Sequence, residues 1–230
     1  MSPSPPPDHA GPAAVTLLVA ERPRCIVLFA AGRGGDPQRH RPLLETLRAR
    51  GCTVVAPRLA LLPSPVPTGP ELAARVDGLG TAADRHADAG LPLVGVGHSL
   101  GAVALLVLAG AEARTLAGEA VTAVPRPIDR LLLLAPPAGF LLHPGALDAV
   151  SARVLIRVGG ADTVTPPAQA ALLRDRLARH VPAGLRLDPA AGHFSYMDEL
   201  PPGVADAQPG RAAFLAALAD DVARFATDSG

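Results

Sequence analysis

A serine at residue 99 lies between two glycines with the spacing of a nucleophile on a tight turn. The motif GHSLG at residues 97–101 follows an apolar run at 93–96 and precedes an Ala- and Leu-rich run at 102–109. These compositions predict a buried strand that turns directly into a helix. In so tight a turn, side chains two residues before and after the serine would collide, and the strained backbone lifts the hydroxyl out of the sheet. We therefore predict that Ser99 is a nucleophile rather than part of a structural Gly-Ser-Gly turn.

Two further side chains have the types that such a serine needs. Asp162 lies four residues beyond a predicted strand at 152–158, and His193 lies on a loop after a predicted strand at 184–187. Since sites in parallel sheets form outside the carboxyl ends of the strands, we expect both residues to meet Ser99 at one edge. The histidine would accept and return the serine proton, and the aspartate would orient the imidazole. The sequence thus predicts a Ser-His-Asp triad, with Asp148 as an alternative acid.

A nucleophilic serine also requires hydrogen-bond donors for the oxyanion that forms when it attacks a carbonyl group. The N–H of Leu100, at the start of the helix after the serine, is one predicted donor. The other is expected from the Gly-rich loop after the apolar run at 25–30, where we favour the N–H of Arg33 over that of Gly32. Whether the Arg33 guanidinium also binds an anionic substrate stays open.

The rest of the chain alternates between strand-like and helix-like segments. Strands are expected at 14–20, 25–30, 53–56, 93–96, 128–135, 152–158 and 184–187, and helices at 42–50, 71–89, 102–113, 167–180 and 209–227. The helix at 71–89 has glycines at 78 and 80 that could interrupt it. Strands that are apolar without alternation indicate a parallel sheet covered on both faces. We predict a disordered Pro-rich tail at 1–12 and a single α/β domain at 13–230, built as a three-layer, doubly wound, mostly parallel sheet.

Composition limits the partners and cofactors. The 230 residues include 21 basic and 21 acidic ones without a basic block, so nucleic acid is not an expected partner. The sequence has no H-E-x-x-H motif, no close His cluster and no P-loop, so neither a metal nor a cofactor is expected. No apolar run reaches the roughly 18 residues of a membrane span, and residues 1–12 do not have the pattern of a signal peptide. We expect a cytoplasmic protein; the sequence leaves its oligomeric state open.

The two cysteines, Cys25 and Cys52, lie near the starts of predicted strands. Neither belongs to a C-x-x-C motif. We expect buried free thiols, with a bridge between adjacent strands as the alternative.

Three motifs together resemble the α/β-hydrolase family. They are GHSLG at 97–101, GGADTVTPP at 159–167 and AAGHF at 190–194, in the family's order of serine, aspartate and histidine. The resemblance covers about residues 14–227. It implies an α/β-hydrolase fold with Ser99 as nucleophile, Asp162 as acid, His193 as base, and Leu100 and Arg33 as backbone oxyanion donors. The chain departs from the family where many relatives have His-Gly, at residues 31–32, and where many carry a helical cap, at residues 136–151.

This resemblance implies a cofactor-independent serine hydrolase that cleaves small or short-chain carboxylic esters through an acyl-enzyme. The short connector at 136–151 favours a small substrate because no lid would enclose a long acyl chain. The candidate substrate contacts are His98, Phe140, His143 and Phe194, with Tyr196 and Met197 as further pocket candidates. Two alternatives stay open: a thioester, lactone or dienelactone substrate for the same triad, and a non-catalytic binding protein on a hydrolase fold.

Overall fold

The structure is a computed structural model in which residues 14–86, 88 and 90–228 are described. The tail predicted at residues 1–12 lies outside these residues. The strands of the main sheet are β1 (Val15–Leu18), β2 (Cys25–Ala30), β3 (Cys52–Pro57), β4 (Leu93–His98), β7 (Arg130–Leu134), β8 (Arg153–Gly159) and β9 (Ala183–Asp188). The α-helices are α1 (Arg41–Ala49), α2 (Gly69–His86), α3 (Leu100–Leu108), α4 (Pro167–Leu177) and α5 (Arg211–Thr227).

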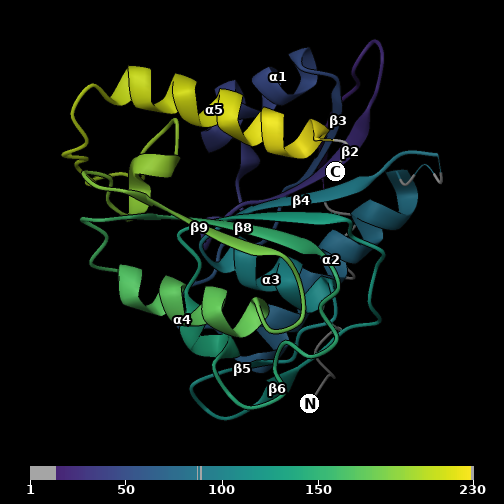
Figure 1. Ribbon diagram of the computed structural model, residues 1–230, viewed down its shortest axis with the longest axis vertical. Coiled ribbons are helices and arrows are strands. Elements are labelled where there is room, and N and C mark those ends of the chain that lie inside the picture. Colours follow the sequence, from purple (N-terminus) through teal and green to yellow (C-terminus); the bar gives the residue numbers. More distant parts are fainter. Residues whose placement is uncertain (1–13, 87, 89, 229–230) are drawn as a thin grey trace, which may run out of the picture.

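Within the described residues, seven strands form one sheet in the order β1-β3-β2-β4-β7-β8-β9. Strand β1 runs antiparallel to β3, and the other neighbouring pairs are parallel. Helices α1 and α5 cover one face of the sheet, and α2, α3 and α4 cover the other (Figure 1). The predicted three-layer α/β architecture with a mostly parallel sheet is confirmed.

Strand β2 shows why the central strands are apolar at every position. All of its residues are buried. Leu28 and Ala30 belong to the core that α2, α3 and α4 cover, whereas Val27 and Phe29 belong to the core under α1 and α5. Because helices cover both faces, each position along the strand is removed from water and favours an apolar side chain.

The chain reverses its direction across the sheet at β2. From β2 it moves to β3 on one side, and it then returns to β4 on the other side of β2. Doubly wound sheets form their sites outside the carboxyl ends of the strands at such a switch point. The loop after β2 and the turn after β4 are therefore neighbours at this edge.

Helix α3 is shorter than the sequence predicts. It ends at Leu108 rather than near residue 113, and Gly110 follows with a φ of +111°. A Cβ at Gly110 would lie 2.8 Å from the carbonyl oxygen of Ala149, so tertiary contact as well as backbone conformation ends the helix here. A small hairpin of β5 (Ala113–Arg114) and β6 (Ala120–Val121) follows, which the sequence pattern did not indicate.

Helix α2 is continuous through both glycines that could have interrupted it. A Cβ on Gly78 would lie 3.1 Å from the Leu59 side chain, and one on Gly80 would lie 3.4 Å from Leu108 of α3. The glycines thus let α2 approach its neighbours closely. This packing outweighs the cost of about 1 kcal/mol that each glycine brings to a helix interior.

The connector between β7 and β8 is described throughout and contains no helical cap. It holds a short 3-10 helix, η2 (Ala138–Leu141), and turns. The connector therefore has no cap, as predicted, and it does not form a lid over the carboxyl edge of the sheet.

Cys25 and Cys52 are register partners on the adjacent strands β2 and β3. Both are buried and free, as expected from their sequence positions. None of the helices in the described part of the chain is both long and apolar enough to cross a membrane.

Candidate active site

Ser99 forms the turn between β4 and α3. Its φ of 54° and ψ of −127° lie in a sparsely populated region for a residue with a side chain. A Cβ on Gly97 would lie 2.8 Å from the Ala102 nitrogen, and a Cβ on Gly101 would lie 2.1 Å from the Ala30 carbonyl oxygen. Glycine is therefore needed at both positions. The conflict at Gly97 is across the turn, as expected, whereas the conflict at Gly101 is with the neighbouring strand β2.

The structure brings Ser99, His193 and Asp162 together in one hydrogen-bonded chain. His193 Nε2 lies 3.0 Å from Ser99 Oγ, and His193 Nδ1 lies 3.0 Å from Asp162 Oδ2. Asp162 and His193 are buried, while Ser99 is only half-buried. A histidine in this position can accept the hydroxyl proton while its other nitrogen stays bonded to the carboxylate.

Asp162 accepts three hydrogen bonds besides that of His193. Its Oδ1 accepts from the N–H groups of Val164 at 2.8 Å and Thr165 at 2.7 Å, and its Oδ2 accepts from the Thr165 hydroxyl at 2.6 Å. Burial acts to raise the pKa of this carboxyl, but the hydrogen bonds from His193 and Thr165 outweigh it and hold the pKa below its ordinary value. The carboxylate is therefore ionised at neutral pH.

Thr165 belongs to the site although the sequence analysis did not identify it. Its Oγ1 lies 3.1 Å from His193 Nδ1 in addition to its bond with Asp162. Its spacing from Asp162 could have identified it in the sequence, because a threonine three residues after an aspartate can donate to the carboxylate from both its hydroxyl and its backbone N–H. Asp148, the alternative acid, lies apart from the triad, and its exposed carboxylate is 3.4 Å from Nε2 of His180.

A network of buried side-chain hydrogen bonds anchors the loop that carries His193. His193 begins a short 3-10 helix, η3 (His193–Tyr196), and the hydroxyl of Tyr196 donates to Asp188 Oδ2 at 2.9 Å. The buried Arg157 donates to both oxygens of Asp188, at 3.0 and 2.7 Å. Tyr196 is fully buried, so it anchors the loop instead of lining a pocket.

Two buried histidines lie behind the triad. His98 Nε2 is 3.0 Å from the His193 carbonyl oxygen, and its ring centroid lies 5.2 Å from that of His193 and 5.5 Å from that of His40. Burial lowers the pKa of His40 to about 4, and burial together with the neighbouring histidines holds the pKa of His98 well below its ordinary value. Both rings are neutral at neutral pH. His98, a candidate substrate contact, is 2% exposed and supports the backbone of the base.

The loop after β2 lies directly against Ser99. A Cβ on Gly32 would be 3.2 Å from Ser99 Cβ and 3.3 Å from His98 Nδ1. On the other side of Ser99, Leu100 is the first residue of α3, where backbone N–H groups have no partner within the helix. The Arg33 side chain turns away to the following loop, where Nε donates to the Leu62 carbonyl at 2.8 Å and a terminal nitrogen to that of Pro63 at 3.1 Å.

The remaining candidate contacts lie in different places. The Phe194 ring meets His193 edge-on with 5.1 Å between centroids. Phe140 packs against the core, and Met197 is buried. His143 Nε2 lies 3.0 Å from the carbonyl oxygen of Glu112. Phe194 is thus the side chain of this group that the structure brings to the triad.

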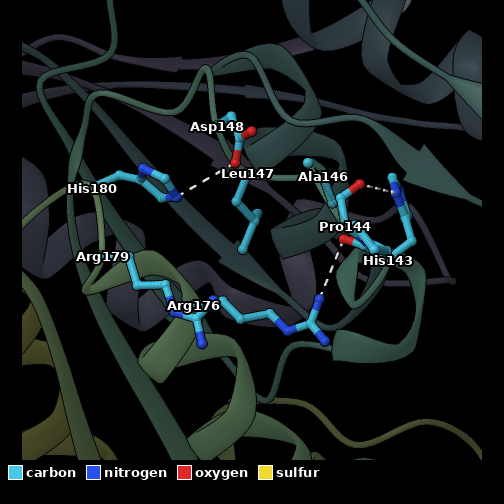
Figure 2. A pocket seen from close by; sticks show the side chains of 9 residues that line it. His143, Pro144, Ala146, Leu147, Asp148, Arg176, Arg179 and His180 are labelled. Atoms are coloured by element: carbon cyan, nitrogen blue, oxygen red, sulfur yellow. Dashed lines mark hydrogen bonds and ion pairs between the residues drawn. The ribbon is translucent and has the colours of Figure 1, made fainter.

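A separate cavity of about 80 Å³ lies at the carboxyl end of α4, and Figure 2 shows His143, Asp148, Arg176 and His180 around it. No triad residue lines it. Arg176 donates to the His143 carbonyl at 3.2 Å. It lies in the last turn of α4, where a positively charged side chain interacts favourably with the helix dipole. These arginine and histidine side chains therefore have structural partners. Within the described residues, no cluster of His, Cys, Asp or Glu side chains could hold a metal ion.

No protein-family model and no curated protein matches the sequence. Several solved structures have a fold similar to that of this chain. A dienelactone hydrolase from Anabaena variabilis has a TM-score of 0.64 and 23% identity, over 92% of this chain and 89% of that one. An esterase from Thermogutta terrifontis with propionate bound has a TM-score of 0.64 and 18% identity, over 97% and 99%. A monoacylglycerol lipase from Paleococcus ferrophilus has a TM-score of 0.63 and 13% identity, over 93% and 99%. These proteins share the fold of this chain.

Proposed function

Because the chain has the α/β-hydrolase fold, we propose that it is a serine hydrolase that cleaves small or short-chain carboxylic esters. The observation that carries this proposal is the hydrogen-bonded chain from Ser99 through His193 to Asp162. The fold alone hosts many activities, so the site geometry has to carry the reaction class. The half-buried Ser99 and the buried acid and base are what nucleophilic catalysis requires.

In the proposed reaction, Ser99 Oγ bonds to the ester carbonyl carbon while His193 Nε2 takes the hydroxyl proton. The N–H groups of Leu100 and Arg33 stabilise the oxyanion. When the tetrahedral intermediate collapses, the alcohol leaves with the proton that His193 returns. A water molecule, deprotonated by His193, then attacks the acyl-enzyme, releasing the carboxylic acid and restoring Ser99. Asp162 stays ionised throughout and stabilises the imidazolium.

The lack of a cap between β7 and β8 supports a small substrate. A lid would be needed to exclude water from a long acyl chain, and the connector supplies only η2 and turns. The similar fold of an esterase with propionate bound agrees with a short acyl group.

A series of p-nitrophenyl esters from acetate to palmitate tests this proposal. We expect kcat/KM to be highest for the shortest chains. A maximum at long chains would contradict the small-substrate part, and an absence of turnover with every ester would contradict the ester-hydrolase part. Covalent labelling by a fluorophosphonate, lost in Ser99→Ala, distinguishes a reactive serine from a non-catalytic binding protein.

A lactone or thioester substrate is the second candidate, because a dienelactone hydrolase is among the structures with a similar fold. The same triad would open a lactone or cleave an acyl-CoA. Comparing kcat/KM for a simple lactone and for acetyl-CoA with that for p-nitrophenyl acetate separates the two candidates. A preference above tenfold for the lactone or the thioester would replace the simple ester as the proposed substrate.

A further inference from the structure

Arg75, on helix α2, is a buried cation that lies outside the triad. It is 3% exposed. One terminal nitrogen donates to the carbonyl oxygens of Ala31 at 3.0 Å and Gly32 at 2.9 Å. The other donates to the carbonyl oxygens of Arg33 at 3.2 Å and Ala60 at 2.9 Å. A single guanidinium thus holds three consecutive carbonyl groups of the loop beside Ser99.

These partners are unusual for a buried charge. Each hydrogen bond that involves Arg75 in the described part of the chain ends on a main-chain carbonyl oxygen, and no carboxylate takes part. Burying a cation without a counter-ion is costly unless dipoles replace the water around it. The aligned carbonyl dipoles of the loop supply that replacement, so the position of the loop and the burial of Arg75 depend on each other.

The direction of these carbonyls determines where the N–H groups point. The peptide bonds of this loop are not cis, and in a trans peptide unit the C=O and the following N–H point to opposite sides. The carbonyls of Ala31 and Gly32 face Arg75, so the N–H groups of Gly32 and Arg33 face away from it. Ser99 lies against the loop, since a Cβ on Gly32 would be 3.2 Å from Ser99 Cβ.

The N–H groups of Gly32 and Arg33 are also free to bind a ligand. No acceptor within residues 14–86, 88 and 90–228 binds either of them. Two consecutive N–H groups without acceptors form a concave anion site of the kind that stabilises an oxyanion.

We propose that Arg75 is a positioning residue that aims the backbone donors of the loop after β2 at the oxyanion formed on Ser99. This inference rests on the proposed hydrolase function. Arg75 touches neither substrate nor the reacting atoms; it acts through the peptide units of Ala31-Gly32 and Gly32-Arg33. Its charge also polarises these units, because a cation on the carbonyl side makes the N–H side a stronger donor.

Lysine cannot replace arginine fully in this role. A guanidinium presents five N–H donors in a planar fork that reaches carbonyls on two sides, whereas an ammonium presents three donors from one point. Arg75→Lys keeps the buried charge and most of the length but loses part of the grip on the loop. We expect it to be intermediate between the wild type and Arg75→Met.

The test compares Arg75→Met and Arg75→Lys with Arg126→Met. Arg126 is a matched control because it also bonds α2, through Asp84 at 2.7 Å, and also donates to a main-chain carbonyl, that of Val124. It has no contact with the oxyanion loop in the described structure. For each variant, kcat and KM for p-nitrophenyl acetate are measured below the thermal transition, together with inhibition by a boronic acid that forms a tetrahedral adduct with the serine.

We expect Arg75→Met to lower kcat by about 10²-fold, the effect of losing one oxyanion donor. KM should change by less than about threefold, and the inhibition constant of the boronic acid should rise in parallel with the loss of kcat. Arg75→Lys should lose about tenfold, and Arg126→Met should stay within about twofold. A purely structural role would lower the folded fraction but leave boronic acid affinity per folded molecule unchanged.

Wild-type kcat/KM in either folded Arg75 variant would overturn the inference. If Arg75→Met does not fold, the Arg75→Lys comparison decides the question alone. If the wild type hydrolyses no ester, the proposed function fails, and the rate of fluorophosphonate labelling of Ser99 then tests Arg75 separately. A tenfold slower labelling in Arg75→Lys would support the positioning role, and an equal rate would overturn it.

Discussion

The two sides of the candidate active site differ in whether a side chain from a distant helix helps to hold them. The nucleophile turn at residues 97–101 is held by backbone contacts, since a Cβ on Gly97 or Gly101 would meet backbone atoms at 2.8 and 2.1 Å. The loop at residues 31–35 has a backbone contact of the same kind, since a Cβ on Gly35 would lie 2.0 Å from the Leu59 carbonyl oxygen, but it is also held by the side chain of Arg75 on α2. The turn is therefore encoded in a short motif, whereas the loop depends in addition on a residue 43 positions away in the sequence.

This difference determines which contacts of the site leave a sequence motif. Steric exclusion at a turn restricts residue types within a few positions, so it leaves a pattern such as GHSLG. The carbonyl groups that Arg75 binds leave no local pattern, because every residue type has a main-chain carbonyl group. Variants on each side of the site test this contrast.

Ser99→Ala should abolish catalysis without changing the conformation of the turn. We expect kcat to fall by about 10⁶-fold, as for loss of the nucleophile in a triad. Alanine keeps the Cβ in the same strained conformation, so the melting temperature should change little. Steady-state ester hydrolysis measures the effect, with Ser151→Ala, an exposed serine, as the control. Retention of more than about 1% of activity would show that another residue is the nucleophile.

Asp162→Asn should show that the acid belongs to the same unit as the turn. We expect kcat to fall by about 10⁴-fold, because the amide no longer holds the imidazole tautomer that accepts the serine proton. Asp148→Asn is the matched variant, since Asp148 pairs with His180 away from the triad. A larger loss in Asp148→Asn than in Asp162→Asn would reverse the assignment of the acid.

A glycine-to-alanine pair compares a sterically restricted glycine of the turn with an open glycine of the loop. Gly101→Ala should destabilise the protein by about 3 kcal/mol or more, because its Cβ would meet the Ala30 carbonyl oxygen at 2.1 Å. Gly34→Ala, in the oxyanion loop, has no atom within 4 Å of the added Cβ and should change stability by less than about 0.5 kcal/mol. Urea unfolding measures both. Similar losses in the two variants would contradict the steric argument for Gly101.

Mild acid should destabilise the protein through His40 and His98, the two buried histidines behind the triad. The pKa of His40 is about 4 in the folded protein, against an ordinary value of 6.5, so the unfolded chain binds the proton more readily. Stability from this residue is therefore fully present above pH 6.5 and falls as the pH drops towards 4. From these two pKa values we expect a loss of about 2 kcal/mol between pH 7.5 and 5.

His98, whose pKa is also held low, should add to this loss. Burial lowers the pKa of Arg75 only to about 10, so the charge on the oxyanion loop does not change in this range. Urea midpoints of the wild type and of His40→Leu at both pH values provide the test. An equal acid sensitivity in His40→Leu would show that His40 is not responsible.

Arg33→Ala should have the smallest effect. The proposed donor is the backbone N–H of Arg33, and its guanidinium is engaged with the carbonyls of Leu62 and Pro63. We expect kcat/KM for a neutral ester to stay within about threefold of the wild type, in contrast to Arg75→Met. A selective loss of more than about tenfold for an anionic ester would instead show that the guanidinium binds substrate.

The α/β architecture and the order of the site residues along the chain could be predicted from the sequence alone. Strands β2 and β4 are buried on both faces, so their apolar character could be read without knowing their neighbours. Because parallel strands place their carboxyl ends at one edge, Ser99, Asp162 and His193 could be expected to meet there. These inferences depend on burial and strand direction, which can be predicted from the apolar runs of the sequence.

The end of α3, the continuation of α2 through its glycines and the side chains that support the site depend on tertiary contacts. Gly110 ends α3 against Ala149, and Thr165 joins Asp162 to His193. In the sequence, Arg75 cannot be distinguished from the other polar residues of its helix. It is buried against main-chain carbonyls because α2 packs against the loop after β2. The physical reason is the same in each case: contacts between residues distant in sequence depend on how the elements approach one another, and no local pattern records that approach.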